Sequence, residues 1–341
     1  MTTSVLICDD SGFARKQMER AIPDGWDVLI SHAENGQQAL EMIRAGKADL
    51  MFLDLNMPVM DGYQTMQAIR REDLPTLVIV VSGDVQPEAR KQMLALGAIE
   101  FIRKPVDNRK LVEILNHYGL YSGEASSAAR SETLSHAEQQ APEYAHDEFD
   151  AYREMANVAM GRAGESLAKL LGEFINLPIP NVNLITNNEL HMAITDIQRN
   201  EQVSAVSKGF VSSGINGEAL VIFNESNFAS MVKLLHYDEG QHSGSLELEA
   251  LMDVSNILIG ACLNALSEQL HVTFSHNHPI ILGRHCDLDE ILKSNIKKQD
   301  KILAIEIAYS IKAHNIHFDL LLLFPNESIE LVLQKLVNTA Y

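Results

Sequence analysis

Short apolar runs alternate with segments of helical period along the first third of the chain. The apolar runs are strand-length and read VLIC (5–8), VLIS (28–31), LMFL (50–53), LVIVV (77–81) and EFI (100–102). Each run precedes a segment with apolar residues at helical spacing, such as Leu111, Ile114 and Leu115. These β–α units predict an α/β fold with a doubly wound, five-stranded parallel sheet. Sheets of this kind bind their ligands at the carboxyl ends of the strands.

The apolar pattern stops between residues 121 and 147. Ser, Ala, Glu and Gln dominate this stretch, and large aliphatic residues are almost absent. Such a segment buries too little apolar surface to offset the entropy that ordering it would cost. We therefore predict a flexible linker at 121–147, between a first domain at 1–120 and a second domain at 148–341.

The second domain contains an internal repeat with an offset of 99 residues. The matching segments read DAYREMANVAMG (150–161) and EALMDVSNILIG (249–260). The offset places Glu154 over Asp253 and Asn157 over Asn256, and it persists at Pro180 and Pro279. This self-similarity predicts an α+β domain built from two halves, about 148–245 and 246–341, related by a pseudo-twofold axis.

The net charge limits the partners of the chain. It has 27 Lys and Arg residues against 46 Asp and Glu residues, a formal charge of −19. This charge repels nucleic acid phosphates, and no Lys/Arg cluster is interleaved with aromatic residues. We therefore predict that the chain does not bind nucleic acid.

The sequence also predicts a cytoplasmic protein that does not cross a membrane. The longest apolar runs, such as Leu320 to Phe324, are far shorter than the roughly 20 residues of a membrane span. The N-terminus shows no basic region followed by a long hydrophobic stretch, so no secretory signal is readable. Cys8, Cys262 and Cys286 lack CxxC spacing, which favours reduced thiols.

Chemically active side chains follow the predicted strands of the first domain. They are Asp9 and Asp10 after the first strand, Asp54 after the third, Ser82 after the fourth and Lys104 after the fifth. Three carboxylates at one sheet edge repel one another unless a cation neutralises them, and an all-oxygen site suits Mg²⁺. When a carboxylate accepts a phosphoryl group, the negative charge on the phosphoryl oxygens must be neutralised. Mg²⁺, an ammonium and a hydroxyl donor can do this together.

The strings that carry these residues resemble the response-regulator receiver family, and most closely its CheY-like members. They read ICDDSGFARK, LDLNMPVMDGY, VVSGD and FIRKP, within residues 4 to about 118. The resemblance implies that Asp54 is the phosphoacceptor and that a sensor histidine kinase is the phosphodonor. Ser82 stands where many members have Thr, which keeps the hydroxyl.

The same resemblance implies roles for the surrounding residues. The implied Mg²⁺ ligands are Asp9, Asp10, Asp54 and the backbone carbonyl of Asn56. Ser82 and Lys104 would contact the phosphoryl oxygens, and Phe101 would be the aromatic residue whose rotamer reports the phosphorylated state. The alternative is a receiver-shaped module that has lost phosphorylation, which would have to retain all of these residues by chance.

Glu154 and Asn157 form the candidate site of the second domain. Residues three apart on a helix project from one face, so an acid and a carboxamide lie side by side. For a single copy, a solvated helix face would be the simpler explanation. The repeat changes this reading, and with it residues 148–341 resemble the CheC, CheX and FliY phosphatase family. Members of that family speed hydrolysis of the aspartyl phosphate on CheY.

This second resemblance implies a catalytic role for the pair. Glu154 would form a salt bridge with the active-site lysine of a phosphorylated CheY-like receiver, while Asn157 would hold the attacking water. In the second copy, Asp253 is one methylene shorter than Glu, so we favour the first site over Asp253 and Asn256. The expected function is hydrolysis of receiver aspartyl phosphate, regulated by the chain's own receiver. It could act in trans, or in cis on Asp54 of its own chain or of a dimer mate.

A non-catalytic adaptor is the alternative function. In that case the second domain binds a signalling partner and phosphorylation of the receiver switches the binding. The shorter Asp253 favours this alternative. A metal site formed by His271, His276, His278, His285 and Cys286 is not expected, because their spacing follows no recognised ligand pattern.

Overall fold

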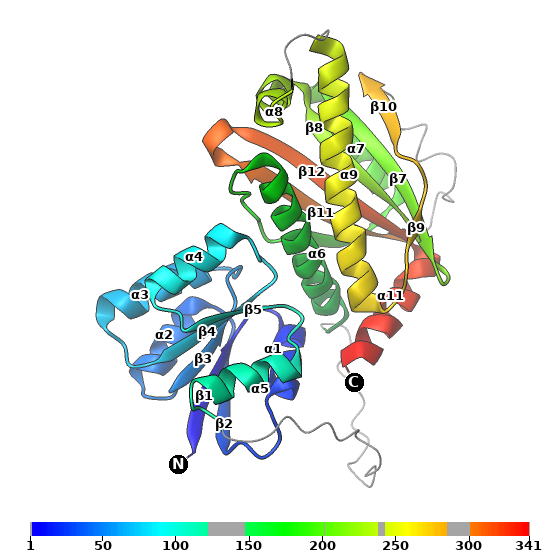
Figure 1. Cartoon of the computed structure of the whole chain (residues 1–341). Helices are drawn as coiled ribbons and strands as arrows, with labels where there is room; N and C mark the ends of the chain where they lie inside the picture. The colour runs from blue at the N-terminus through cyan, green and yellow to red at the C-terminus, as the bar shows by residue number, and fades with distance from the viewer. Residues whose placement is uncertain (1, 122–146, 201, 238–242, 285–300, 341) are drawn as a thin grey trace. The chain divides into compact units, whose positions relative to one another are not determined.

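A computed structural model describes residues 2–121, 147–200, 202–237, 243–284 and 301–340 (Figure 1). The described residues divide into two compact units, each built on its own sheet. The predicted linker at 121–147 lies outside the described residues, apart from Tyr121 and Asp147 at its ends. His285 and Cys286 lie outside them as well.

The first sheet is parallel, with strand order β2-β1-β3-β4-β5. Its strands are β1 (Thr3–Cys8), β2 (Val28–Ala33), β3 (Leu50–Leu53), β4 (Leu77–Ser82) and β5 (Glu100–Arg103). Its helices are α1 (Gly12–Ala21), α2 (Gly36–Arg44), α3 (Gly62–Glu72), α4 (Pro87–Leu96) and α5 (Asn108–His117). The predicted five-stranded parallel sheet is confirmed. Because the strand order reverses between β1 and β3, the carboxyl ends of these strands form the edge where such folds bind ligands.

Local sequence explains where the helices of this unit begin. Ser11, Asn35, Asp61 and Asp107 each cap a helix by accepting a hydrogen bond from a backbone N–H of its first turn. Helices cover both faces of the sheet, with α1 and α5 on one face and α2, α3 and α4 on the other (Figure 1). The β3 strand is buried along its whole length, so it forms the centre of the core.

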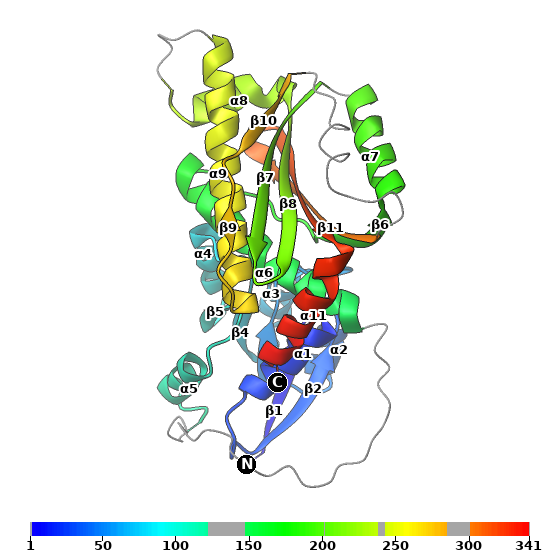
Figure 2. The ribbon, with the colours of Figure 1, turned by 90° about the vertical axis from the view of Figure 1, so that its right-hand side faces the viewer.

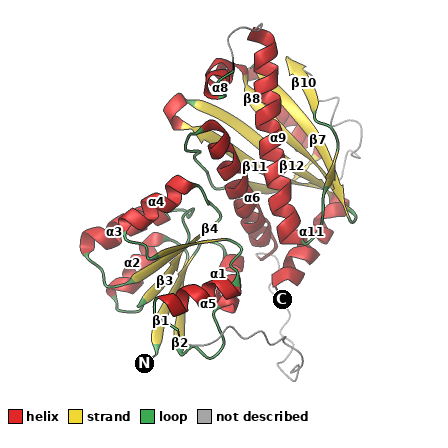
Figure 3. Ribbon diagram, viewed as in Figure 1, coloured by secondary structure: helices red, strands yellow, loops and turns green. Residues whose placement is uncertain are grey.

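The second unit is built on an antiparallel sheet with strand order β10-β7-β8-β12-β11-β6, and the short β9 pairs with β7. Its strands are β6 (Asn181–Thr186), β7 (Val203–Ser212), β8 (Ile215–Asn224), β9 (Ser275–His276), β10 (Ile280–Arg284), β11 (Lys301–Ile311) and β12 (Ile316–Pro325). Its helices are α6 (Asp147–Leu171), α7 (Asn187–Asn200), η1 (Glu225–Asn227), α8 (Phe228–Leu234), α9 (Ser243–Leu270), η2 (Lys312–His314) and α11 (Asn326–Ala340). The combination of long helices and an antiparallel sheet (Figure 3) is an α+β arrangement.

The two long helices of this unit, α6 and α9, lie side by side on one face of the sheet, and α7 lies on the other (Figure 2). The Gln269 side chain donates to the carbonyl of Met155 at 3.2 Å, and Arg162 pairs with Glu268 at 2.7 Å. These contacts fix α6 against α9. Under α7, Leu190 packs against apolar side chains of β7, β8, β11 and β12.

One helix among the described residues is long and apolar enough to cross a membrane by length and composition. It is the part of α9 from Leu246 to Leu270, and 56% of its most apolar window is buried inside the structure. A core helix packed against a sheet passes the same test, so this is weak evidence for a span. Polar residues interrupt the segment, which is why continuous apolar runs in the sequence did not reveal it. The cytoplasmic location stays a prediction.

Candidate functional site

The candidate phosphorylation site lies at the carboxyl ends of β1, β3, β4 and β5. Backbone hydrogen bonds tie these strand ends together. The Asp54 N–H donates to the Cys8 carbonyl and the Lys104 N–H to the Ser82 carbonyl, each at 2.9 Å. The parallel register therefore converts residues far apart in the sequence into neighbours at one edge.

Three carboxylates meet at this edge. One oxygen from each of Asp9, Asp10 and Asp54 lies within 4.8 Å of the others. Burial raises the pKa of Asp9 to about 6, with Lys104 opposing the shift and Asp54 adding to it. Burial also raises the pKa of Asp10 to about 7, and repulsion from Asp9 and Asp54 adds to this shift. Ionising these carboxylates therefore costs free energy, and a bound cation would offset that cost.

Lys104 lies between two of these acids. Its Nζ is 2.7 Å from Asp9 Oδ2 and 3.3 Å from Asp54 Oδ1, and all three side chains are buried. The ammonium neutralises part of the cluster. It does not satisfy all of it, because Asp10 Oδ1 is buried and has no hydrogen-bond partner among the described residues.

The other predicted residues of this site lie close to the acids along the chain or at the same edge. The Asn56 N–H donates to Asp54 Oδ2 at 3.0 Å and so helps to orient the candidate acceptor. Ser82 ends β4 and is fully buried, and Phe101 is buried on β5.

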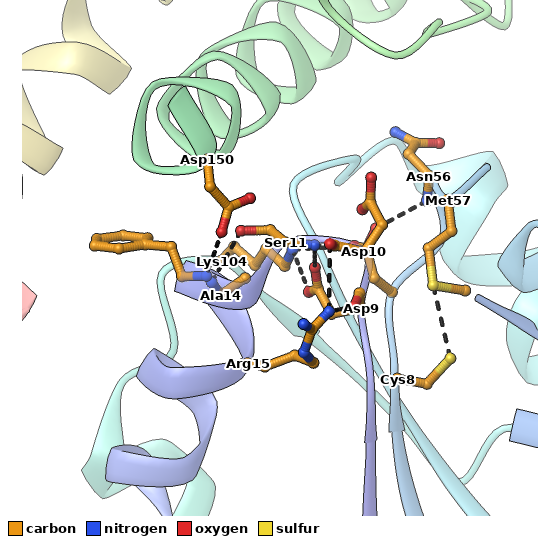
Figure 4. Close-up of polar contacts among 12 residues, drawn as sticks. Cys8, Asp9, Asp10, Ser11, Ala14, Arg15, Asn56, Met57, Lys104 and Asp150 are labelled. Carbon is orange, nitrogen blue, oxygen red and sulfur yellow. Dashed lines mark hydrogen bonds and ion pairs between the residues drawn. The ribbon is translucent and has the colours of Figure 1, made fainter. Parts of the chain in front are cut away.

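Sequence reasoning missed Arg15. Its Nη1 donates to the Asp9 carbonyl oxygen at 2.6 Å and lies 3.3 Å from the Asp10 carbonyl oxygen (Figure 4). The signal was a cation on the helix that directly follows the acidic pair. Basic side chains are common on helix surfaces, so the sequence gave no reason to single this one out.

Comparison with known proteins agrees with this geometry. The family model described as "Response regulator receiver domain" matches residues 5–116. Chemotaxis protein CheY of Bacillus subtilis is 30% identical over 116 residues, which make up 34% of this chain and 97% of that protein. Residues 5–116 belong to the response regulator receiver family. The predicted receiver domain of two-component signalling is thus confirmed.

Two further similarities differ in the share of the chain that they cover. The protein-glutamate methylesterase/protein-glutamine glutaminase of Geobacillus kaustophilus is 36% identical over 136 residues, and the match spans 38% of this chain and 39% of that protein. The crystal structure of Thermotoga maritima FliY is 16% identical, covering 57% of this chain and 97% of that chain with a TM-score of 0.41. That score is too low for the FliY likeness to assign a fold.

Receiver domains bind Mg²⁺ in an acidic pocket, and the acids of this receiver fit that ion. The cluster offers only oxygen ligands, which hard divalent cations prefer. It also includes Asp10 Oδ1, which has no hydrogen-bond partner in the part of the chain that the structure describes. Asp9, Asp10 and Asp54 would hold the ion.

The candidate residues of the second domain lie on α6 and α9. Glu154 and Asn157 are one helical turn apart on α6 and are 3% and 9% exposed. Asn157 Oδ1 is buried and accepts no hydrogen bond from the described residues. An acceptor in this condition can be satisfied by a water molecule.

The second copy of this pair has a different environment. Asp253 and Asn256 are exposed on α9, and Tyr237 Oη donates to Asp253 Oδ2 at 2.6 Å. Burial and this hydrogen bond raise the pKa of Tyr237 above its ordinary value. Asn256 lines an open groove of about 620 Å³ between α6 and α9. The two copies are therefore not equivalent.

The histidines of the second domain do not form a metal site within the described part of the chain. His271, His276 and His278 are exposed. The three aspartates of the receiver are the group there with the geometry to hold a metal ion.

Proposed function

We propose that this chain is a signalling phosphatase, in which a receiver phosphorylated on Asp54 regulates a CheC-like domain. That domain hydrolyses the aspartyl phosphate of CheY-like receivers, in trans or in cis. The observation that carries the proposal is the pairing of Glu154 with Asn157 on α6, in a domain whose sequence repeats itself. The phosphodonor for Asp54 would be a sensor histidine kinase.

At the receiver, the chain's own residues would position the phosphoryl group. Lys104 and Ser82 lie at the edge where Asp54 accepts it, and Lys104 can exchange a carboxylate for a phosphoryl oxygen. Bound Mg²⁺ would neutralise the remaining phosphoryl charge. Asn56, through its N–H, would keep Asp54 oriented for transfer.

The strand order supports the duplicated architecture. The sheet reads β10-β7-β8 and then β12-β11-β6. If β6, β7 and β8 of one half correspond to β10, β11 and β12 of the other, exchanging the halves reproduces the same order in reverse. A pseudo-twofold axis between β8 and β12 has this property.

Two cross-contacts between the halves support it as well. Ser328 Oγ accepts from the Asn216 N–H and donates to its carbonyl, both at 2.9 Å. Asn227 Nδ2 donates to the His317 carbonyl at 3.0 Å. Asn227 and Ser328 are 101 residues apart, and so are Asn216 and His317. Each contact joins the start of one half's last helix to the first residues of the other half's inner strand.

The proposed reaction needs a water in line with the phosphorus atom. Asn157 Oδ1 would accept a hydrogen bond from that water, because a carboxamide orients without titrating. Glu154 would pair with the lysine of the phosphorylated receiver. The water oxygen bonds to phosphorus as the bond from phosphorus to the aspartyl oxygen breaks. Both protons of the water end on the inorganic phosphate, and the aspartate leaves as a carboxylate.

Phosphate release from a phosphorylated CheY-like receiver tests this function. Wild type is expected to accelerate release, and Glu154→Ala/Asn157→Ala to slow the accelerated rate by on the order of 100-fold, since the water loses its position. Lys169→Ala is the matched control, because Lys169 is exposed on the same helix and pairs only with Glu165 in the described contacts. Equal rates for the double variant and the control would sink the proposal.

The adaptor function is favoured by one observation. Tyr237 already occupies one oxygen of Asp253, which leaves the second copy less able to bind a lysine. If the domain only binds a partner, phosphorylation of Asp54 would change complex formation without changing the lifetime of any aspartyl phosphate.

A further inference from the structure

Arg15 contacts the backbone of both adjacent residues that carry metal-binding carboxylates. Its Nη1 donates to the Asp9 carbonyl at 2.6 Å and is 3.3 Å from the Asp10 carbonyl. Its Nη2 is 3.3 Å from Glu34 Oε1. The Arg15 side chain is 16% exposed, whereas that of Glu34 is 63% exposed. The bonds to the carbonyls are therefore shielded, and the ion pair is not.

The turn between β1 and α1 is held from two directions. From within the turn, the Ser11 N–H donates to Asp9 Oδ1 at 3.0 Å, and Ser11 Oγ caps α1 by accepting from Ala14. From α1, the Arg15 guanidinium holds the carbonyls. A planar guanidinium with several donors can fix two acceptors at once, and its charge strengthens each bond.

We propose that Arg15 is a positioning residue for the divalent cation. It holds the peptide units of Asp9 and Asp10 so that both carboxylates face the site before the cation arrives. Without it, the two carboxylates repel each other and the turn is free to move them apart. The turn then has to become ordered when the cation binds, and the free energy that this ordering costs weakens the Mg²⁺ affinity.

Electrostatic repulsion alone predicts the opposite change in Mg²⁺ affinity when Arg15 is removed. Arg15 is positive, so removing its charge would strengthen the binding of a cation to the same acids. Loss of an outer contact that orients ligands typically weakens metal binding by about 10- to 100-fold. The direction of the change in Mg²⁺ affinity therefore separates positioning from simple repulsion.

The experiment is a calorimetric Mg²⁺ titration of the full-length chain as wild type, Arg15→Met, Arg15→Lys and Glu34→Gln. We expect Arg15→Met to weaken Mg²⁺ binding by about 10- to 100-fold. The Mg²⁺ affinity of Arg15→Lys should fall between those of wild type and Arg15→Met, because one ammonium reaches fewer carbonyl acceptors than a guanidinium. Glu34→Gln, the control that removes only the exposed partner, should stay close to wild type.

Three results would overturn the proposal. One is unchanged or tighter Mg²⁺ binding by a folded Arg15→Met chain. Another is an equal loss in Glu34→Gln, which would assign the effect to the ion pair. If Arg15→Met does not fold, Arg15→Lys decides, and an affinity equal to wild type would overturn the proposal.

Discussion

Lys104 Nζ lies 2.7 Å from Asp9 Oδ2, and both side chains are buried. Lys104 directly follows β5 and Asp9 directly follows β1, so the contact joins the ends of these two strands. The same ammonium is 3.3 Å from Asp54 Oδ1. One lysine therefore neutralises a predicted metal ligand, Asp9, and the predicted phosphoacceptor, Asp54, together. We expect phosphorylation of Asp54 to give this lysine a new anionic partner.

Replacing this lysine should destabilise the receiver. Lys104→Ala leaves two buried carboxylates without their cation, and breaking a buried pair in this way costs about 3–5 kcal/mol. Denaturant unfolding at pH 8 without Mg²⁺ measures the loss. Trp26 is the only tryptophan of the chain and packs against the receiver core, so its fluorescence follows this domain. Lys47→Ala, at an exposed position, is the control, and equal stability of the two variants would refute the assignment.

Stabilisation by Mg²⁺ should increase with pH. Asp9 and Asp10 have folded-state pKa values raised to about 6 and about 7, so the cation-free receiver loses stability as pH rises through this range. Mg²⁺ binds the ionised acids and opposes that loss. The shift in melting temperature caused by Mg²⁺, followed by Trp26 fluorescence, should be small at pH 5.5 and larger at pH 8. An equal shift at both values would contradict the role of these acids.

Phosphorylation should depend on Asp54. Asp54→Asn keeps the size of the side chain but removes the oxygen nucleophile, so incubation with an acyl phosphate donor and Mg²⁺ should add no phosphoryl group by intact mass. Asp73→Asn is the matched control, since Asp73 is exposed and sits in a left-handed conformation that Asn tolerates. Incorporation by Asp54→Asn at the wild-type level would place the acceptor elsewhere.

The two acid–carboxamide pairs of the second domain should contribute unequally to phosphate release. Asp253 already accepts a hydrogen bond from Tyr237, whereas Asn157 has a buried acceptor oxygen without a partner in the described structure. We expect Asn157→Ala to reduce phosphate release much more than Asn256→Ala does. A greater loss with Asn256→Ala would move the main site to α9.

The receiver site could be predicted from the sequence because its chemically active residues directly follow the strands. Parallel strands bring their carboxyl ends to one edge, so the sequence alone predicts that Asp9, Asp54 and Lys104 lie together. Arg15 escaped notice because it acts on backbone carbonyls, and no pattern of side chains marks such a contact.

The second domain could be predicted in outline only. The repeat located Glu154 and Asn157 on one helix, and the structure places both on α6. The hydrogen bond from Tyr237 to Asp253 depends on how the residues after α8 pack against α9, which the spacing of the two residues does not reveal. The burial of Glu154 likewise depends on tertiary packing and not on helical period.

The most direct test of the central claim is the lifetime of aspartyl phosphate in one reaction. Full-length wild type and Asn157→Ala are each phosphorylated on Asp54 and mixed with a phosphorylated CheY-like receiver, and intact mass follows both phosphoryl groups. The account predicts that Asn157→Ala lengthens at least one of the two lifetimes by on the order of 100-fold. Two lifetimes that match wild type would contradict it.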